Sequence, residues 1–225
     1  MGCKVITGYL MAAASSKDPV INRVEAFSDG VFAIAITLLA LGLEVPQVQL
    51  TASPSLLLHA LLAEWPRFAI FVLSFVLIGE VWVNHHRMFS YIHRSALWLI
   101  WLNLGLLLSV VVIPFAIELL GEYALQPGSR LVATVIYGTT WTLGGVFYNA
   151  LWWYASHNHR LIDPDLDVQP ITHRWILGPI LYGASTLLAF ISVWLSLALF
   201  AFMLPVPQPT RSTLGPAPPA IGRNI

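Results

Sequence analysis

Long apolar stretches follow one another along most of the chain, and several are long enough for a membrane-spanning helix. The nearly uncharged ones are Val31–Leu43, Phe68–Gly79, Ala96–Ile117, Leu131–Ala155 and Ile176–Leu204. A helix needs about 20 apolar residues to cross a hydrocarbon core about 30 Å thick. The pattern predicts an all-α, polytopic membrane protein with room for five or six crossings.

The first apolar helix has a clear start and a clear stop. Asp18-Pro19 offers an N-cap carboxylate followed by a proline at the first helical position. We expect this helix to run to about Val45, where Pro46 stops it. Residues 1–17 then form an N-terminal extension and residues 18–204 the transmembrane domain. Residues 205–225, with six prolines, are predicted to be a disordered tail.

The remaining helices are predicted from the same alternation of apolar runs and polar breaks. The second opens near Leu56, becomes strongly apolar after Pro66 and continues past His86. The third and fourth cover residues 96–117, with a possible kink at Pro114, and residues 131–155. A polar linker, residues 156–174, precedes a last apolar stretch of 30 residues, Trp175–Leu204. That stretch is too long for one comfortable crossing and too short for two full ones.

The distribution of basic residues favours two short helices in the last stretch, giving six crossings. With a cytoplasmic N-terminus, six crossings leave only Arg67 and Arg130 outside, in agreement with the positive-inside rule. The basic residues that then lie inside are Lys4, Lys17, Arg23, Arg87, Arg94, Arg160, Arg174, Arg211 and Arg223. Five crossings would move Arg211 and Arg223 outside. We therefore expect both termini in the cytoplasm.

Composition narrows the possible functions. Apolar residues make up 57% of the chain, charged residues 10%, and the mean hydropathy is +0.75, so most of the surface faces lipid. The formal net charge is zero, which argues against a nucleic-acid partner. The single cysteine, Cys3, excludes an intrachain disulfide. Function must therefore reside in the membrane part.

The first two turns of the first helix carry an unusual set of polar groups. They include Arg23, Glu25, Ser28 and Asp29, directly before an apolar run. Ionisable groups inside a membrane usually mark a transport pathway or a structural pair between helices. Both interpretations stay open on these residues alone, and both can hold together.

The apolar run that follows places one stripe on the helix. At about 100° per residue, Ile34, Leu38 and Leu41 project within about 60° of one another, with Thr37 at the edge of the stripe. Apolar stripes are common on membrane helices as helix–helix or lipid contacts. A hydrophobic constriction lining a pore would show the same spacing, so the pattern alone does not separate the two.

The polar start and the apolar run together resemble a known family. Arg23-x-x-x-Phe27-Ser28-Asp29, followed by Gly-Val-Phe-Ala-Ile-Ala-Ile-Thr-Leu-Leu, closely resembles the first-helix signature of the prokaryotic relatives of the endosomal and lysosomal potassium channel, the transmembrane protein 175 type. Trp82-x-Asn84-His85-His86 is also similar to the family's second helix. The resemblance covers Asn22 to about Leu204.

This resemblance implies a multi-pass protein of the prokaryotic inner membrane that assembles as a homotetramer surrounded by lipid. Four copies of the first helix would line a central pore for monovalent cations, without a re-entrant pore loop; the chain indeed has no Thr-Val-Gly-Tyr-Gly filter. The family's constriction rings map to Ile34, Leu38 and Leu41, with Thr37 beside them. The expected activity is passive, modestly selective potassium conduction, with no cofactor beyond the permeant ion.

The polar half of the motif is predicted to orient the first helix. We expect Arg23, Ser28 and Asp29 to form a hydrogen-bonded network with Trp82, Asn84 or His85 of the second helix. Phe27 belongs to the same structural motif by resemblance. Such a network would aim the aliphatic stripe at the pore axis without itself being the filter.

Other functions remain open on the residues alone. A metal enzyme would use clustered histidines, but only His85-His86 and His157-x-His159 cluster, which is too few for the usual boxes. Asp163-x-Asp165-x-Asp167 lacks the glycine and closing glutamate of a calcium loop. We therefore expect neither catalysis nor a bound metal. The main alternative to a channel is a proton-coupled carrier of an ion or solute, although the chain shows no convincing internal repeat.

Glu118 and Glu122 follow the third apolar run and are expected near the outer mouth. They could concentrate cations there or simply form an exposed helix end.

Overall fold

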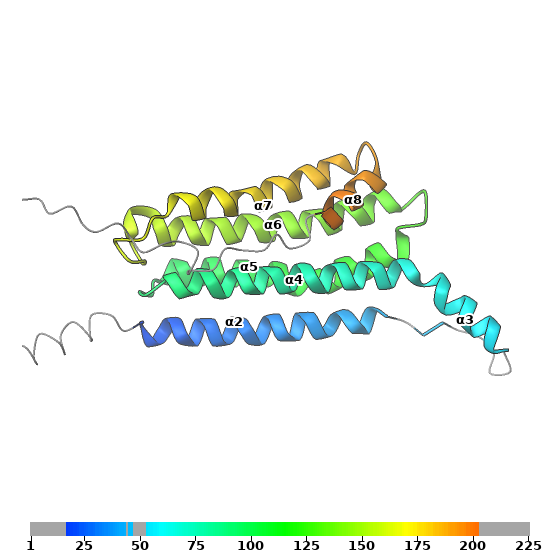
Figure 1. The fold of residues 1–225 in the computed structure, drawn as a ribbon, viewed down its shortest axis with the longest axis horizontal. Helices are drawn as coiled ribbons and strands as arrows, with labels where there is room; N and C mark the ends of the chain where they lie inside the picture. The colour runs from blue at the N-terminus through cyan, green and yellow to red at the C-terminus, as the bar shows by residue number, and fades with distance from the viewer. Residues whose placement is uncertain (1–16, 44, 47–52, 203–225) are drawn as a thin grey trace, which may run out of the picture.

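The computed structural model describes residues 17–43, 45–46 and 53–202, and within these ranges the fold is helical (Figure 1). The predicted N-terminal extension, apart from Lys17, and the predicted tail lie outside the described residues. The α-helices are α2 (Pro19–Leu38), α3 (Pro54–Ala63), α4 (Trp65–Tyr91), α5 (Leu97–Tyr123), α6 (Arg130–Ser156), α7 (Gln169–Leu188) and α8 (Val193–Phe202). Two short 3₁₀ helices are η1 (Leu39–Gly42) and η2 (His157–His159).

Four helical segments are long and apolar enough to cross a membrane. They are Pro19–Gly42, Trp65–Tyr91, Leu97–Tyr123 and Arg130–His159. Figure 1 shows them running side by side, with α7 along the opposite side of the bundle from α2. The chain is therefore an all-helical, multi-pass membrane protein, as the hydropathy pattern predicts.

Several predicted helix limits were wrong, and a 3₁₀ ending and the positions of prolines account for some of the differences. The first α-helix ends at Leu38, not Val45, because its last turn tightens into the 3₁₀ helix η1, a common ending for a helix. The expected opening of the second helix near Leu56 is instead a separate helix, α3. Pro66 stands in the first turn of α4, where a missing N–H costs nothing, and so marks a new helix.

The other two differences lie at ends where the chain leaves the apolar region. α5 continues six residues past the predicted Ile117, to Tyr123, and stays helical through Pro114. α7 begins at Gln169, with Pro170 in its first turn, so the polar linker is shorter than predicted. A helix has no need to stop at a membrane boundary, which is why hydropathy does not locate these ends.

The last apolar stretch divides into α7 and α8, as the charge count favoured. Residues 189–192 make the turn, in which Ala189, Ile191 and Ser192 donate backbone hydrogen bonds to carbonyls at the end of α7. α8 has only 10 residues. At 1.5 Å per residue it is about 15 Å long, about half the thickness of a hydrocarbon core.

Glycines let the central helices approach closely. A Cβ on Gly105 of α5 would lie 2.5 Å from Cε1 of Phe147 on α6. A Cβ on Gly145 would lie 3.0 Å from Cβ of Pro179 on α7. Because lipid tails are as apolar as the helices, membrane helices associate through such close packing. The α5–α6–α7 unit is thus a tightly packed scaffold against which α2 and α4 are set.

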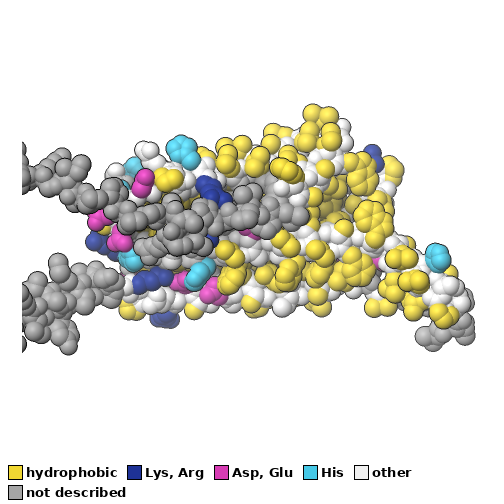
Figure 2. Space-filling view, in the orientation of Figure 1, with side chains coloured by type: hydrophobic (Ala, Val, Ile, Leu, Met, Phe, Trp, Pro, Cys, Tyr) yellow, Lys and Arg dark blue, Asp and Glu magenta, His cyan; other side chains and the backbone are white. Residues whose placement is uncertain are grey.

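One end of the bundle, which we call the basic end, is closed by connected loops. It is the end where α2, α5 and α7 begin and where α4 and α6 finish. His93 N donates to Leu161 O at 2.9 Å, and Ile92 bridges Ile162. Figure 2 shows the charged and histidine side chains gathered toward this end, whereas apolar side chains cover most of the remaining visible face.

Candidate functional site

The helix α2 has two contrasting faces. Its buried residues are Ile21, Ser28, Phe32 and Ala35, continued by Leu39 in η1, and they pack toward α4 and α5. The spacing of three, four or seven residues between them is that of one helix face. This buried face fixes how α2 is rotated in the subunit.

The predicted pore residues lie on the other face. The side chains of Ile34, Leu38 and Leu41 are 61%, 40% and 76% exposed in the single subunit. Thr37 is also exposed, and its hydroxyl is turned back to its own helix, donating to Ile34 O at 2.8 Å. The stripe is therefore available to lipid, to another subunit or to a pore.

The 3₁₀ ending of α2 changes the geometry of the stripe. Residues three apart eclipse one another in a 3₁₀ helix, whereas they are offset by about 60° in an α-helix. Because η1 covers Leu39–Gly42, Leu41 is brought closer into line above Leu38 than α-helical spacing would place it. Hydropathy and periodicity did not predict this feature.

A buried chain of hydrogen bonds joins the polar start of α2 to two other helices. Asn103 of α5 donates through Nδ2 to Ser28 Oγ at 2.9 Å, and its Oδ1 lies 2.9 Å from His85 Nε2 of α4. Ser28 Oγ in turn donates to Val24 O at 2.8 Å. His85 stacks on Phe89, with ring centroids 4.4 Å apart. All three members of the chain are buried, so each depends on the others to satisfy its polar atoms.

Asp29 makes a second link between α2 and α4. Its Oδ1 accepts a hydrogen bond from Trp82 Nε1 at 2.9 Å. One turn earlier, Glu25 lies between Lys17 and His86, with 3.0 Å from Glu25 Oε1 to His86 Nδ1. The first helix is thus tied to α4 at two successive turns.

The other predicted motif residues are not brought into this network. The side chains of Arg23 and Phe27 are exposed. Asn84 takes part through its backbone, since its carbonyl accepts from the Tyr148 hydroxyl at 3.0 Å, while its buried Oδ1 has no hydrogen-bond partner among the described residues. The structure thus assigns the polar contacts of α2 to Ser28 and Asp29, with Glu25 added.

Asn103 is the central residue of this hydrogen-bonded chain, and the network predicted from the sequence did not include it. A lone amide inside an otherwise apolar membrane helix is itself a signal, because it must find partners within the bundle. On this ground, Asn103 could have been predicted from the sequence as a member of the network. It could not have named Ser28 and His85 as its two partners.

The opposite end of the bundle carries a separate charged cluster. Arg67 of α4 pairs with Glu122 of α5 and, at 3.2 Å, with Glu64. These residues adjoin a cavity of about 520 Å³ that also reaches Glu118 and Gly42 at the end of η1. Glu122 is therefore an ion-pair partner, while Glu118 faces open space near the end of α2.

The histidine and aspartate clusters do not form a metal site in the described part of the chain, where no group of three or more potential ligands comes together. His93 Nε2 lies 3.4 Å from Asp163 Oδ2, which links the loop after α4 to the loop after α6. Asp163 thus helps to connect the two loops that close the basic end.

Comparison with known proteins identifies the family. Residues 23–114 match the family described as the endosomal/lysosomal potassium channel TMEM175. A potassium channel of Streptomyces collinus is 40% identical over 205 residues, covering 87% of this chain and 98% of that protein. A potassium channel of Chamaesiphon minutus is 42% identical over 194 residues, covering 85% of this chain and 94% of that protein.

The fold also matches a solved structure. The crystal structure of a lysosomal potassium-selective channel TMEM175 homolog from Chamaesiphon minutus aligns with a TM-score of 0.74 and 38% identity, covering 83% of this chain and 95% of that one. The similarity thus extends over nearly the whole bundle, well beyond the first-helix motif. The chain belongs to the TMEM175 family.

Proposed function

We propose that the chain forms a potassium-permeable cation channel in which four copies of α2 surround a central pore. The observation that carries this proposal is the contrast between the faces of α2: one is fixed by the buried Ser28–Asn103–His85 chain, while the other presents Ile34, Leu38 and Leu41 outside the subunit core. The relatives named as potassium channels support the assignment. The basic end is proposed to be cytoplasmic, with six crossings of the prokaryotic inner membrane.

The proposed mechanism is selection by the cost of dehydration. Rings of four aliphatic side chains at Ile34, Leu38 and Leu41 offer no ligands, and they follow one another at about 5–6 Å along the helix. A potassium ion holds its water less tightly than sodium and so loses less free energy in such a constriction. Modest potassium selectivity and closure by dewetting both follow from an apolar collar.

Polar residues in this mechanism position the collar. Ser28, through Asn103, and Asp29, through Trp82, fix α2 against α5 and α4. A rotation of α2 by one residue, about 100°, would remove the stripe from the axis. Thr37, whose hydroxyl is satisfied by Ile34 O, is the one polar side chain beside the rings.

The experiment is a paired substitution in liposomes. Ile34→Ala should raise the unitary potassium conductance and lower the potassium-to-sodium permeability ratio several-fold, because a smaller ring dehydrates ions less. The matched control is Leu108→Ala on α5, since Leu108 is 65% exposed and Ile34 is 61% exposed. Reversal potentials under potassium and sodium gradients give the ratio.

If both variants keep wild-type conductance and selectivity, the stripe faces lipid and the pore assignment is wrong. The same recordings test the carrier alternative. A channel passes current without a proton gradient, whereas a proton-coupled carrier shows slow flux that requires one.

A further inference from the structure

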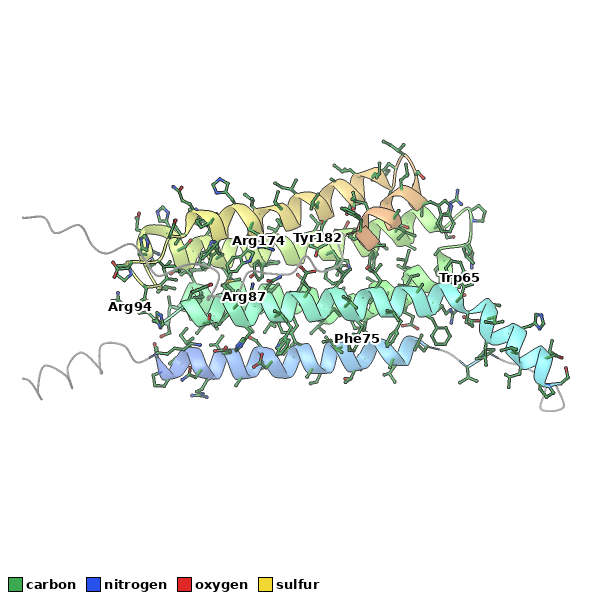
Figure 3. The ribbon with its side chains drawn as sticks, in the orientation of Figure 1. Trp65, Phe75, Arg87, Arg94, Arg174 and Tyr182 are labelled. Atoms are coloured by element: carbon green, nitrogen blue, oxygen red, sulfur yellow. The ribbon has the colours of Figure 1, made fainter. Side chains whose placement is uncertain are left out.

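The two phenylalanines of α2 have opposite environments. Phe32 is 1% exposed and packs beside the His85 ring of α4, with ring centroids 5.4 Å apart. Phe27 is 57% exposed, and its direction differs from that of Phe32 by about 140°. Side chains project from α2 both toward α4 and away from it (Figure 3). Phe27 therefore belongs to the outer face of the helix, although it directly precedes the buried Ser28.

Phe27 lies in line with the proposed pore stripe. The α-helix is continuous from Pro19 to Leu38, so directions along it can be compared at about 100° per residue. On this scale Phe27 projects between Ile34 and Leu38, about 20° from each. Its exposed fraction of 57% is also close to the 61% of Ile34. Any rotation of α2 that turns Ile34 and Leu38 toward a pore axis therefore turns Phe27 toward it as well.

The helix surface between Phe27 and Ile34 is comparatively flat. The two residues are about 10 Å apart along the helix axis. Gly30, about 40° from the direction of Ile34, has no side chain, and a Cβ added there would meet no described atom within 4 Å. Val31, on the other flank of the stripe, is partly buried against the core. A pore lined by this stripe would be narrow at Phe27 and at Ile34, and wider at the level of Gly30.

We propose that four copies of Phe27 form an aromatic collar at the basic end of the pore, and that the wider level at Gly30 binds organic quaternary ammonium ions. This inference rests on the proposed function and deepens it by naming a ligand class for the same pore. The faces of aromatic rings attract cations, and proteins recognise quaternary ammonium groups with cages of such rings. The alkyl groups of the ion suit the apolar walls, while the ring at Ile34 stops a wide ion from passing through.

The charged groups of α2 near this level are compatible with a cationic ligand. Glu25 and Asp29 both contact side chains of α4 and so do not face the stripe. Arg23, one turn before Phe27, is exposed within about 40° of the same direction. A long arginine side chain at the end of a membrane helix keeps its charge in water. There salt screens the charge beyond about 8 Å at physiological ionic strength, so Arg23 opposes entry mainly at low salt.

The test uses tetrabutylammonium on single channels of the full-length protein in planar bilayers. From the basic end it should block the potassium current, whereas from the other side the collars at Ile34, Leu38 and Leu41 hold it back. Phe27→Ala should raise the half-blocking concentration several-fold. Phe27→Trp should preserve block, because tryptophan is the best aromatic partner for a cation.

The matched control for Phe27 is Phe190→Ala. Phe190 is 63% exposed and lies in the turn after α7, on the far side of the bundle from α2. Its half-blocking concentration should equal that of the wild type.

A second measurement does not depend on the size of the current. In a Cys3→Ser background, tetrabutylammonium should slow the reaction of Gly30→Cys with a small thiol reagent several-fold. Asn22→Cys is the control on the same helix, since Asn22 is exposed but points about 120° away from Ile34. Its reaction rate should not change.

Three results would overturn the proposal. They are a conducting wild-type channel that tetrabutylammonium does not block, equal half-blocking concentrations for wild type and Phe27→Ala, and equal protection of the two cysteines. Failure of the pore assignment has a different signature, because Ile34→Ala would then also leave conductance and selectivity unchanged. If Ile34→Ala alters selectivity while Phe27→Ala leaves block unchanged, the aliphatic pore stands and the aromatic site is wrong.

Discussion

The two faces of α2 differ in what fixes them. The inner face is held by a buried hydrogen bond between Ser28 and Asn103 of α5, by a more exposed one between Asp29 and Trp82 of α4, and by apolar packing of Phe32 and Ala35. The outer face has exposed aliphatic side chains at Ile34, Leu38 and Leu41, and Thr37 is the polar residue within this proposed pore-lining stretch. In this subunit, polar contacts with α4 and α5 fix the rotation of α2, and the apolar stripe stays uncovered.

The largest expected effect comes from breaking the centre of the inner face. Asn103→Ala should prevent stable assembly, because it leaves both Ser28 and His85 buried without their partner. Each orphaned buried polar group costs about 1–3 kcal/mol. The measurement is the thermal midpoint and the elution profile in detergent.

The control for Asn103 is Asn22→Ala, an exposed asparagine on α2, which should change the free energy of unfolding by less than about 0.5 kcal/mol. A normal thermal midpoint for Asn103→Ala would show that the buried chain does not hold the inner face.

The next effect concerns the Asp29–Trp82 link. Asp29→Ala should lower the yield of assembled protein more than it alters selectivity, since it removes a hydrogen bond to a charged group worth about 1.5–3 kcal/mol. Trp82→Phe removes only the donor, and the double variant should be little worse than either single one. Thermal midpoints of the four proteins give the coupling energy, and strictly additive losses would contradict the link.

A smaller stability effect, with a larger functional one, is expected on the outer face. Leu38→Ala should leave the thermal midpoint nearly unchanged, within about 0.5 kcal/mol, because Leu38 is 40% exposed in the subunit. It should nevertheless raise conductance and lower the potassium-to-sodium ratio. Leu104→Ala, at 37% exposure on α5, is the matched control and should be silent in both measurements. Identical conductance for both variants would place Leu38 away from the pore.

The smallest effect is a pH dependence at the N-terminal end of α2. The Ser95 hydroxyl, the Val20 amide and the Ser95 amide hold the pKa of Asp18 below its ordinary value of 3.8. Because the folded pKa is depressed, this contribution is present above the ordinary pKa and is lost as pH falls through the lowered one. The thermal midpoint of Ser95→Ala should therefore lie slightly below wild type at neutral pH and converge with it in acid.

Asp165→Asn, in the exposed linker, is the control for this titration and should show no such convergence. A constant gap between Ser95→Ala and wild type across the acid range would mean that Asp18 does not provide the pH dependence.

Much of the architecture could be predicted from the apolar stretches, because the transfer of an apolar segment from water into a bilayer is favourable. The four long spans and the two-helix division of the last stretch follow from hydropathy and charge. The limits of helices were less predictable. The change from α-helix to 3₁₀ helix after Leu38 and the separate helix α3 depend on local backbone geometry and on proline. Hydropathy contains no information on either.

The candidate site, like the fold, could be predicted only in part from the sequence. The motif Arg23-x-x-x-Phe27-Ser28-Asp29 singled out the first helix and indicated the family that the chain resembles. The comparisons confirm that family. It did not distinguish Ser28 and Asp29, which have partners on other helices, from Arg23 and Phe27, which are exposed. Helical periodicity places residues on a face, but neighbouring helices decide which face is buried.

By itself, the sequence determined that this chain is a bundle of membrane helices whose first helix carries polar groups at one end and an apolar stripe beyond them. Tertiary structure alone decided that Asn103 joins Ser28 to His85, that Trp82 donates a hydrogen bond to Asp29, and that Ile34, Leu38 and Leu41 stay uncovered in the subunit. The reason is that apolar composition fixes where a segment can be stable, whereas pairing between residues as far apart as 28 and 103 depends on how helices rotate and pack.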